Sequence, residues 1–268
     1  MESKALRIMM IEDNLGDAML IGEMLKEAKN RRFLLQHNLQ LSSAFESLSH
    51  KNYDLVLLDL GLPDSCGLET LKKVLAKFPA IPVVIMTGLD DEELGFEAVK
   101  LGAQDYLIKG QIDSNLLLRT IRYSIERKRT EEIIREKEER LRATFDQAAV
   151  GIAHVRFDGS WIMVNRKFSE LAGYEHPELM RLGVHEVLQQ DDITFKGNAS
   201  AAYSTEKKFV NKLKCSVKWA KLTFSRVSEA PGNQGYLIIV AEDITDRKEL
   251  EQALKETDSP YNKKALSF

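Results

Sequence analysis

The feature that most constrains this sequence is a run of four apolar residues, 55–58, that leads directly into Asp59 and the turn formers Gly61 and Pro63. A continuous apolar run bounded by turn formers predicts a strand buried on both faces of a parallel sheet. Asp59 is then expected at the carboxyl end of the strand, where open α/β sheets bind their ligands. The alternative is an aspartate that only caps a helix or a turn.

The first half of the chain alternates short apolar segments with amphipathic helical segments, which is typical of βα units around a parallel sheet. We predict strands at 6–11, 33–35, 55–59, 81–86 and 106–108, and helices at 16–28, 42–48, 67–76 and 92–101. The fold class is therefore α/β, with a doubly wound five-stranded parallel sheet. Right-handed crossovers place the carboxyl ends of all these strands on one edge. The polar residues expected at that edge are Glu12, Asp13, Asp59, Thr87 and Lys109.

These side chains indicate phosphoryl chemistry. Clustered carboxylates repel one another unless a cation neutralises them, and hard oxygen ligands suit Mg²⁺. One carboxylate can then act as the nucleophile, while Lys109 offsets charge on the transferring phosphoryl group and Thr87 donates to one of its oxygens. The pattern predicts an aspartyl-phosphate site.

With these residues at its strand ends, the segment 1–125 resembles the receiver domain of two-component response regulators, which has a flavodoxin-like fold. The matching motifs are Glu12-Asp13, Asp59 with Pro63 and Gly67, Thr87-Gly88, and residues 105–109. The resemblance implies that Asp59 is the phosphoacceptor and that a histidine kinase or phosphotransfer protein is the partner. It implies Mg²⁺ ligands at Glu12, Asp13, Asp59 and the backbone carbonyl of Gly61. It also implies Thr87 as switch hydroxyl, Lys109 as phosphate-contacting ammonium and Tyr106 as switch aromatic.

The sequence departs from the family at two positions. Gly110 stands where the family usually has proline after the lysine, and we expect a looser backbone there rather than a cis peptide bond. Gly61, two residues after the phosphoacceptor, has no side chain to shield a phosphoryl group. We therefore expect water to reach the phosphoryl group easily and its lifetime to be short.

A long charged helix is predicted after the receiver-like region. Residues 114–143 contain neither proline nor glycine, and residues 126–140 are almost all charged. Ile134 and Leu141 lie seven residues apart, and with Arg127 and Ala148 they form a weak heptad line. We predict a continuous signalling helix that pairs in a homodimer; the alternative is an unpaired spacer.

The second half predicts an α+β domain with an antiparallel sheet. Expected strands are 150–155, 161–164, 209–217, 219–227 and 236–241, with short helices at 165–171 and 177–188 between the second and third. Asp158-Gly159 is a strong hairpin signal.

This order of elements resembles a PAS domain. The local motifs agree with it: residues 145–151, Asp158-Gly159, Val164-Asn165, Phe168 with 171–174, and the terminal segment 242–248. The predicted organisation is a receiver domain at 1–125, a helical or coiled-coil linker at 126–143, a PAS domain at 144–246, and an exit helix and tail at 247–268.

The ligand of the PAS-like region stays unknown from sequence. Flavin photochemistry would need a cysteine on the helical side of the pocket, whereas Cys215 falls on a predicted strand. Haem would need an axial ligand, for which His154, His176 and His185 are the candidates. An empty or promiscuous pocket with a dimerisation role is the favoured interpretation.

Composition excludes several classes of protein. The net charge is −3 without a long block of like charge, so no nucleic-acid partner is expected. No apolar run approaches 18 residues and no secretory segment precedes residue 6, so we expect no membrane association. Cys66 and Cys215 lie far apart, which favours a reducing, cytoplasmic compartment.

The sequence has no kinase histidine box, nucleotide-binding lobe or helix-turn-helix region. We therefore expect a response regulator that is not an enzyme beyond phosphoacceptance and possible autophosphatase activity. The alternatives are the regulatory front of a larger hybrid histidine kinase or diguanylate cyclase, and a phosphate sink that competes for a kinase.

Overall fold

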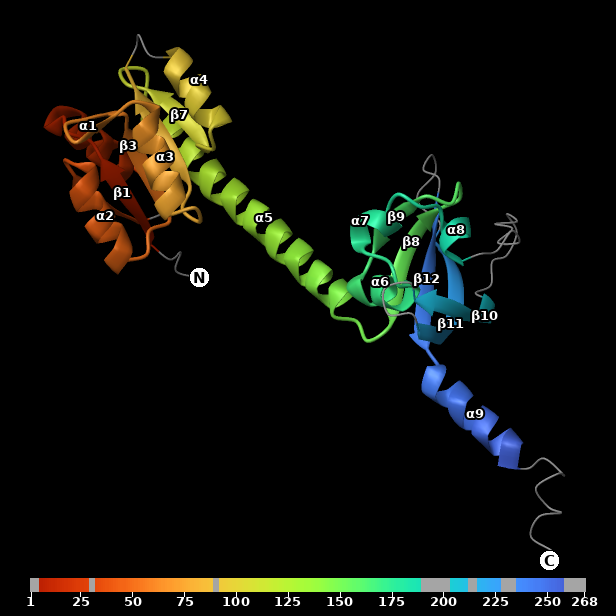
Figure 1. Ribbon diagram of the computed structural model, residues 1–268. Coiled ribbons are helices and arrows are strands. Elements are labelled where there is room, and N and C mark those ends of the chain that lie inside the picture. Colours follow the sequence, from red (N-terminus) through yellow and green to blue (C-terminus); the bar gives the residue numbers. More distant parts are fainter. Residues whose placement is uncertain are drawn as a thin grey trace, which may run out of the picture. The chain divides into compact units, whose positions relative to one another are not determined.

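The computed structural model describes residues 5–28, 32–88, 92–188, 203–211, 216–227 and 235–257. The chain divides into two compact units, Met1–Lys137 and Glu138–Phe268 (Figure 1). Each unit has its own five-stranded sheet, and the two sheets differ in strand direction.

The first unit contains the predicted parallel sheet. Its strands are β1 (Leu6–Ile11), β2 (Phe33–Asn38), β3 (Leu55–Asp59), β6 (Val83–Thr87) and β7 (Asp105–Ile108). They lie in the order β2-β1-β3-β6-β7, and every neighbouring pair is parallel. The order reverses at β1, which is a doubly wound arrangement with its ligand edge at the carboxyl ends of the central strands.

Helices cover both faces of this sheet. One face packs against α2 (Leu41–His50), α3 (Leu68–Lys77) and α4 (Glu92–Lys100), and the other against α1 (Leu15–Lys26) and the first turns of α5 (Ser114–Asp146). Because β3 is covered on both sides, residues 55–58 are fully buried. This double burial is the physical reason for the continuous apolar run in the sequence.

The second unit contains an antiparallel sheet with one helical face. Its strands are β8 (Gly151–Arg156), β9 (Trp161–Val164), β10 (Tyr203–Asn211), β11 (Ser216–Val227) and β12 (Tyr236–Asp243), in the order β10-β11-β12-β8-β9. The short helices α6 (Arg166–Ala172), α7 (His176–Leu179) and α8 (Val184–Leu188) pack on one face and build the core. Phe168 and Phe224 are its largest fully buried side chains.

Two helices are largely polar. α5 continues without a break from the first unit into the second, as predicted, and α9 (Thr245–Thr257) follows the last strand. Within the described residues, no helix combines the length and apolarity needed to cross a lipid bilayer.

The structure differs from the sequence-based description at two places. The segment 209–217 is not a single strand, because β10 ends at Asn211 and β11 begins at Ser216. The turn after Asp59 also contains a small hairpin that the sequence did not indicate, β4 (Gly61–Leu62) paired with β5 (Ser65–Cys66). Cys215, the turn at 231–233 and the tail after residue 257 lie outside the described residues.

Candidate functional site

The site lies at the carboxyl edge of the parallel sheet. Glu12 directly follows β1, Asp59 ends β3, Thr87 ends β6, and Lys109 directly follows β7. These strands are neighbours in the sheet, so residues that are up to 97 positions apart reach one edge. The backbone joins them there as well, because the Lys109 N–H donates to the Thr87 carbonyl over 2.7 Å.

Three carboxylates and one ammonium group meet at this edge. One oxygen from each of Glu12, Asp13 and Asp59 lies within 4.8 Å of the other two. The Lys109 Nζ atom is 2.7 Å from Asp59 Oδ2 and 2.7 Å from Glu12 Oε2. The cluster therefore carries more negative than positive charge, with the cation placed between two of the carboxylates.

Burial makes this charge arrangement unusual. The Glu12 side chain is 0% exposed, and desolvation raises its pKa to about 7, with the Asp59 charge adding to the rise and Lys109 opposing it. Burial alone would lower the pKa of Lys109, but hydrogen bonds and charges from Asp59 and Glu12 outweigh it and raise the pKa. Lys109 therefore stays an ammonium, while Glu12 is held close to its titration point.

Backbone contacts hold the Glu12 carboxylate and the start of α1. The Asn14 N–H donates to Glu12 Oε1 over 3.1 Å, and the Asn14 side chain accepts from the Gly16 and Asp17 N–H groups as the N-cap of α1. This cap brings Asp17 in the first turn to 3.2 Å from Lys109 Nζ. Sequence reasoning missed Asp17, although a carboxylate four residues after Asp13 in a predicted helix start was the available signal.

The loop after Asp59 is held by two interactions. The Gly61 N–H donates to Asp59 Oδ1 over 3.0 Å, which orients the carboxylate. The Asp64 side chain accepts from the Leu41 and Ser42 N–H groups, both over 2.9 Å, and so caps α2 from a distant loop. These hydrogen bonds lower the pKa of Asp64 although desolvation opposes them. Asp64 is a second residue that the sequence did not single out.

The hydroxyl and the aromatic residue predicted beside the site lie on the neighbouring strands. Thr87 is 3% exposed, and its Oγ1 has no hydrogen-bond partner among the described residues. Tyr106 lies on β7 and is half-buried against the core face that packs on α4. Gly110 has φ of 84°, a left-handed conformation in which proline cannot stand, since proline fixes φ near −65°.

The residues present fit a hard divalent cation. Glu12, Asp13 and Asp59 offer oxygen atoms close enough to share one ion, and the fully buried Glu12 carboxylate gains from a neighbouring positive charge. Such an ion would supply charge neutralisation for phosphoryl oxygens beside Asp59. The site is thus suited to a carboxylate nucleophile acting on a phosphoryl group.

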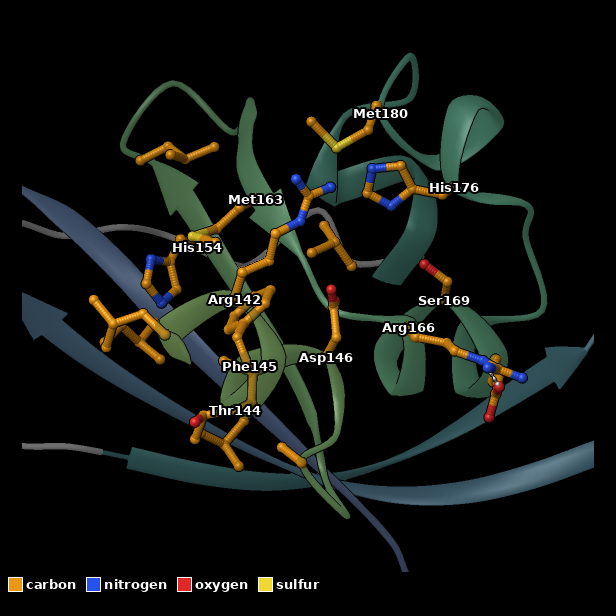
Figure 2. A pocket seen from close by; sticks show the side chains of 18 of the residues that line it. Arg142, Thr144, Phe145, Asp146, His154, Met163, Arg166, Ser169, His176 and Met180 are labelled. Carbon is orange, nitrogen blue, oxygen red and sulfur yellow. Dashed lines mark hydrogen bonds and ion pairs between the residues drawn. The ribbon is translucent and has the colours of Figure 1, made fainter. Parts of the chain in front are cut away.

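The second unit has a separate groove of about 1340 Å³ (Figure 2). Its lining is largely apolar and includes Ile152, Met163, Ile238 and Val240 from the sheet face opposite the helices. Leu141 and Phe145 from the end of α5 line it too.

The three histidines considered as haem ligands occupy different places. His154 lies within β8, and its ring stacks on the Tyr236 ring with 5.1 Å between the ring centroids. Burial lowers the pKa of His154. His154 and His176 both line the groove, as Figure 2 shows, whereas His185 is in α8. Of the three candidates, His154 and His176 line this groove and His185 does not.

Comparison with known proteins identifies the first unit. Residues 8–122 match the response regulator receiver domain family. Transcriptional regulatory protein ZraR of Klebsiella oxytoca is 35% identical over 109 residues, covering 41% of this chain and 24% of ZraR. Regulatory protein LuxO of Vibrio cholerae is 46% identical over 66 residues, covering 25% of this chain and 14% of LuxO.

A solved structure with the same region is the signal receiver domain of a response regulator from Bacteroides fragilis. It is 27% identical, with a TM-score of 0.41, and the match covers 46% of this chain and 98% of that one. A receiver domain protein from Clostridium thermocellum is 23% identical, with a TM-score of 0.42, and the match covers 47% of this chain and 98% of that one. The family match, rather than these structures, identifies residues 8–122 as a response regulator receiver domain.

The relatives correct one expectation from the sequence. The chain spans about a quarter or less of the length of ZraR and LuxO, which are named as regulatory proteins. Most of each relative therefore lies outside the shared region, in parts that these 268 residues do not match. The prediction that the protein has no catalytic output was wrong, because it rested on the absence of catalytic motifs from a sequence that matches only about a quarter of the length of ZraR.

Proposed function

We propose that the chain accepts a phosphoryl group on Asp59 in a two-component phosphorelay. The observation that carries the proposal is the placement of the Lys109 ammonium 2.7 Å from Asp59 Oδ2, beside carboxylates that fit a Mg²⁺ ion. The donor is the phosphohistidine of a sensor histidine kinase or a phosphotransfer protein.

In the proposed step, an Asp59 carboxylate oxygen attacks phosphorus. The bond between phosphorus and the donor nitrogen breaks, and the electron pair of that bond stays with the donor. Lys109 offsets the charge on the transferring oxygens, and the Gly61 N–H holds the other Asp59 oxygen away from the reaction. Glu12, Asp13, Asp59 and the Gly61 carbonyl would hold Mg²⁺, which would neutralise charge on the phosphoryl oxygens. Thr87 donates to the bound phosphoryl group, and Tyr106 responds to that contact.

Acetyl phosphate with Mg²⁺ tests this assignment. We expect phosphorylation of the wild-type chain, seen by intact-protein mass spectrometry, and none of Asp59→Asn. Asp54→Asn is the matched control, since Asp54 directly precedes the other end of β3, where it accepts from the Arg7 N–H over 2.7 Å. Label retained by Asp59→Asn would refute the site.

We propose further that the second unit is a PAS domain and that α5 carries the phosphorylation signal to it. The proposal is supported by the order of two strands, three short helices and three strands. It is also supported by Asn165, which accepts from the Ile152 N–H and donates to the Phe145 carbonyl, so that the end of α5 is hydrogen-bonded to the domain that follows. Amide hydrogen exchange in residues 145–165 should change when Asp59 is phosphorylated, and unchanged exchange would count against α5 as the route.

We propose that the chain is a homodimer through α5 and the uncovered sheet face. Ile134 and Leu141 on α5 are 52% and 71% exposed, which is unusual for large apolar side chains on a stable helix. The apolar lining of the groove continues from Leu141 across the sheet. Sedimentation should show a dimer, and a strict monomer with and without phosphorylation would refute it.

An alternative is that this receiver regulates the output of a longer protein. The length of ZraR and LuxO favours it. Genomic sequence beyond codon 268 in the same reading frame would decide for this alternative.

A further inference from the structure

Gly95 occupies an unexpected position for a glycine. It is buried in the interior of α4, a helix of only nine residues. Glycine is among the least favourable residues in a helix interior, and short helices are marginal by themselves. A buried glycine there needs a packing reason.

The reason is the ring of Tyr106. A Cβ atom added at Gly95 would lie 2.5 Å from Tyr106 Cδ2, 2.8 Å from Cγ and 3.1 Å from Cε2. Real Cβ atoms do not approach other atoms at 2.5 Å, so the ring occupies the space that any side chain at position 95 would need. Gly22, in the interior of α1, offers the opposite case: its added Cβ would make only an ordinary contact, 3.8 Å from Leu35 Cδ2.

The same ring sits beside the strand that carries Thr87. On the paired strands β6 and β7, Ile85 lies opposite Tyr106 and Thr87 lies opposite Ile108. Residues two apart on a strand point to the same face, so Thr87 and Tyr106 share the face that packs on α4. Ile85, Ala98 and Tyr106 belong to one apolar cluster there.

We propose that Gly95 is a positioning residue of this receiver. Because glycine has no side chain, it leaves a space, here called the seat, in which the Tyr106 ring packs against α4, and this contact couples the ring to the helix. While the ring is seated, it packs directly on the α4 backbone. If the ring leaves, no side chain at position 95 fills the space, and a void of this kind is unfavourable. A change in ring conformation must therefore shift α4. This inference rests on the proposed phosphoacceptor function, since phosphorylation is what moves the ring.

The steric part is tested by a thermal double-mutant cycle in the full chain. Both tryptophans, Trp161 and Trp219, lie in the second unit, so far-UV circular dichroism reports both units and tryptophan fluorescence only the second. We expect Gly95→Ala to lower the melting temperature of the receiver by a few degrees, whereas Gly22→Ala raises it. In a Tyr106→Ala background, Gly95→Ala should instead raise it, because only helix propensity remains.

The switching part needs a readout that a purely structural glycine would not affect. We would label the tyrosines with 3-fluorotyrosine, assign Tyr106 by Tyr106→Phe, and add beryllofluoride with Mg²⁺ as a phosphoryl mimic. The wild-type Tyr106 resonance should move on addition. In Gly95→Ala it should be displaced from the start and move by less than half as much, while Gly22→Ala behaves as the wild type.

Each other outcome overturns the inference. A Gly95→Ala variant that gains stability as Gly22→Ala does would show that the ring is not seated on Gly95. A full Tyr106 response in Gly95→Ala would show that the seat does not couple the ring to α4. A wild-type chain that is phosphorylated by acetyl phosphate without a Tyr106 response sinks this inference alone, whereas loss of phosphorylation itself sinks the proposed function.

Discussion

The two sheets of this protein differ in how many of their faces pack against helices. The parallel sheet of the receiver is covered by helices on both faces, and its cluster of carboxylates stands at the carboxyl ends of strands. The antiparallel sheet of the second unit is covered by helices on one face, and its other face lines a largely apolar groove.

The difference shows where each sheet can interact with something else. A sheet buried on both sides has only its edge available, so a ligand must be small and is bound by strand ends. A sheet face that, among the described residues, only the end of α5 borders has a broad apolar surface available, which suits a second chain more than an ion. We expect the first unit to act by chemistry and the second by association.

The largest effect is expected at the edge of the parallel sheet. Lys109→Met removes the ammonium shared by Asp59 and Glu12, and we expect phosphorylation by acetyl phosphate to slow by about 10²- to 10³-fold, the usual loss for one charge-stabilising donor. Lys218→Met, which breaks the 2.6 Å ion pair with Asp243 in the second unit, is the control and should leave the rate unchanged. If Lys109→Met and Lys218→Met slowed phosphorylation equally, the chemistry would not be confined to the first unit.

The buried Glu12 carboxylate should make receiver stability depend on pH. Its pKa of about 7 in the metal-free fold lies above the unfolded value of 4.5, so folding favours the protonated form. The free energy of unfolding should therefore fall as the pH rises from about 4.5 through about 7, by about 3 kcal/mol at 1.4 kcal/mol per pKa unit.

Urea denaturation in EDTA at pH 5 and pH 8 measures this loss. Glu12→Gln should remove most of the pH dependence of the receiver transition. Tryptophan fluorescence, which reports the second unit, should show little of it, because the described part of that unit has no fully buried carboxylate. If the free energy of unfolding of the receiver still fell with pH in Glu12→Gln, another group would be responsible for the pH dependence.

A charge on the uncovered sheet face should weaken dimerisation. Ile238 lines the groove and is only partly buried, so Ile238→Glu should spare the core but raise the dimer dissociation constant at least tenfold, about 1.4 kcal/mol. Lys255→Glu on exposed α9 is the control. Sedimentation velocity over a concentration series measures both, and equal association of the two variants would exclude this face as the interface.

Gly61 should set the lifetime of the phosphoryl group. An added Cβ at this position would meet only Asp59 Oδ1 at 3.7 Å and Oδ2 at 3.9 Å, so a larger side chain would stand over the carboxylate without a clash. Gly61→Leu should slow dephosphorylation roughly fivefold, about 1 kcal/mol in barrier height. An unchanged or faster loss of label, timed after removal of acetyl phosphate, would contradict the shielding argument.

The smallest effect is expected for Asp64→Asn, which keeps one acceptor oxygen but weakens the cap on α2. The receiver should lose about 0.5 kcal/mol, at the low end for an N-cap change. Asp158→Asn, within the β8–β9 hairpin of the second unit, should shift only the tryptophan-detected transition. If Asp64→Asn also shifted the tryptophan-detected transition of the second unit, the two units would not unfold separately.

The sequence predicted the receiver well because its signals are local. Each buried parallel strand is a continuous apolar run, and the residue at its end is visible in the sequence, so the pattern alone assigned Glu12, Asp59, Thr87 and Lys109 to one edge. The boundary between β10 and β11 was placed wrongly because both are long half-buried strands, and their alternating pattern continues from one to the next without a clear break.

Only the tertiary structure decided which side chains meet across elements. Asp17 reaches Lys109 from a helix, Asp64 caps a helix 22 residues earlier in the chain, and Gly95 faces the Tyr106 ring. Such contacts depend on how helices are rotated and seated on the sheet, which no periodicity encodes. The sequence by itself determined where the strands end and hence which side chains stand beside Asp59. The packing of helices on the two sheets determined what holds that edge and which sheet face lines the apolar groove.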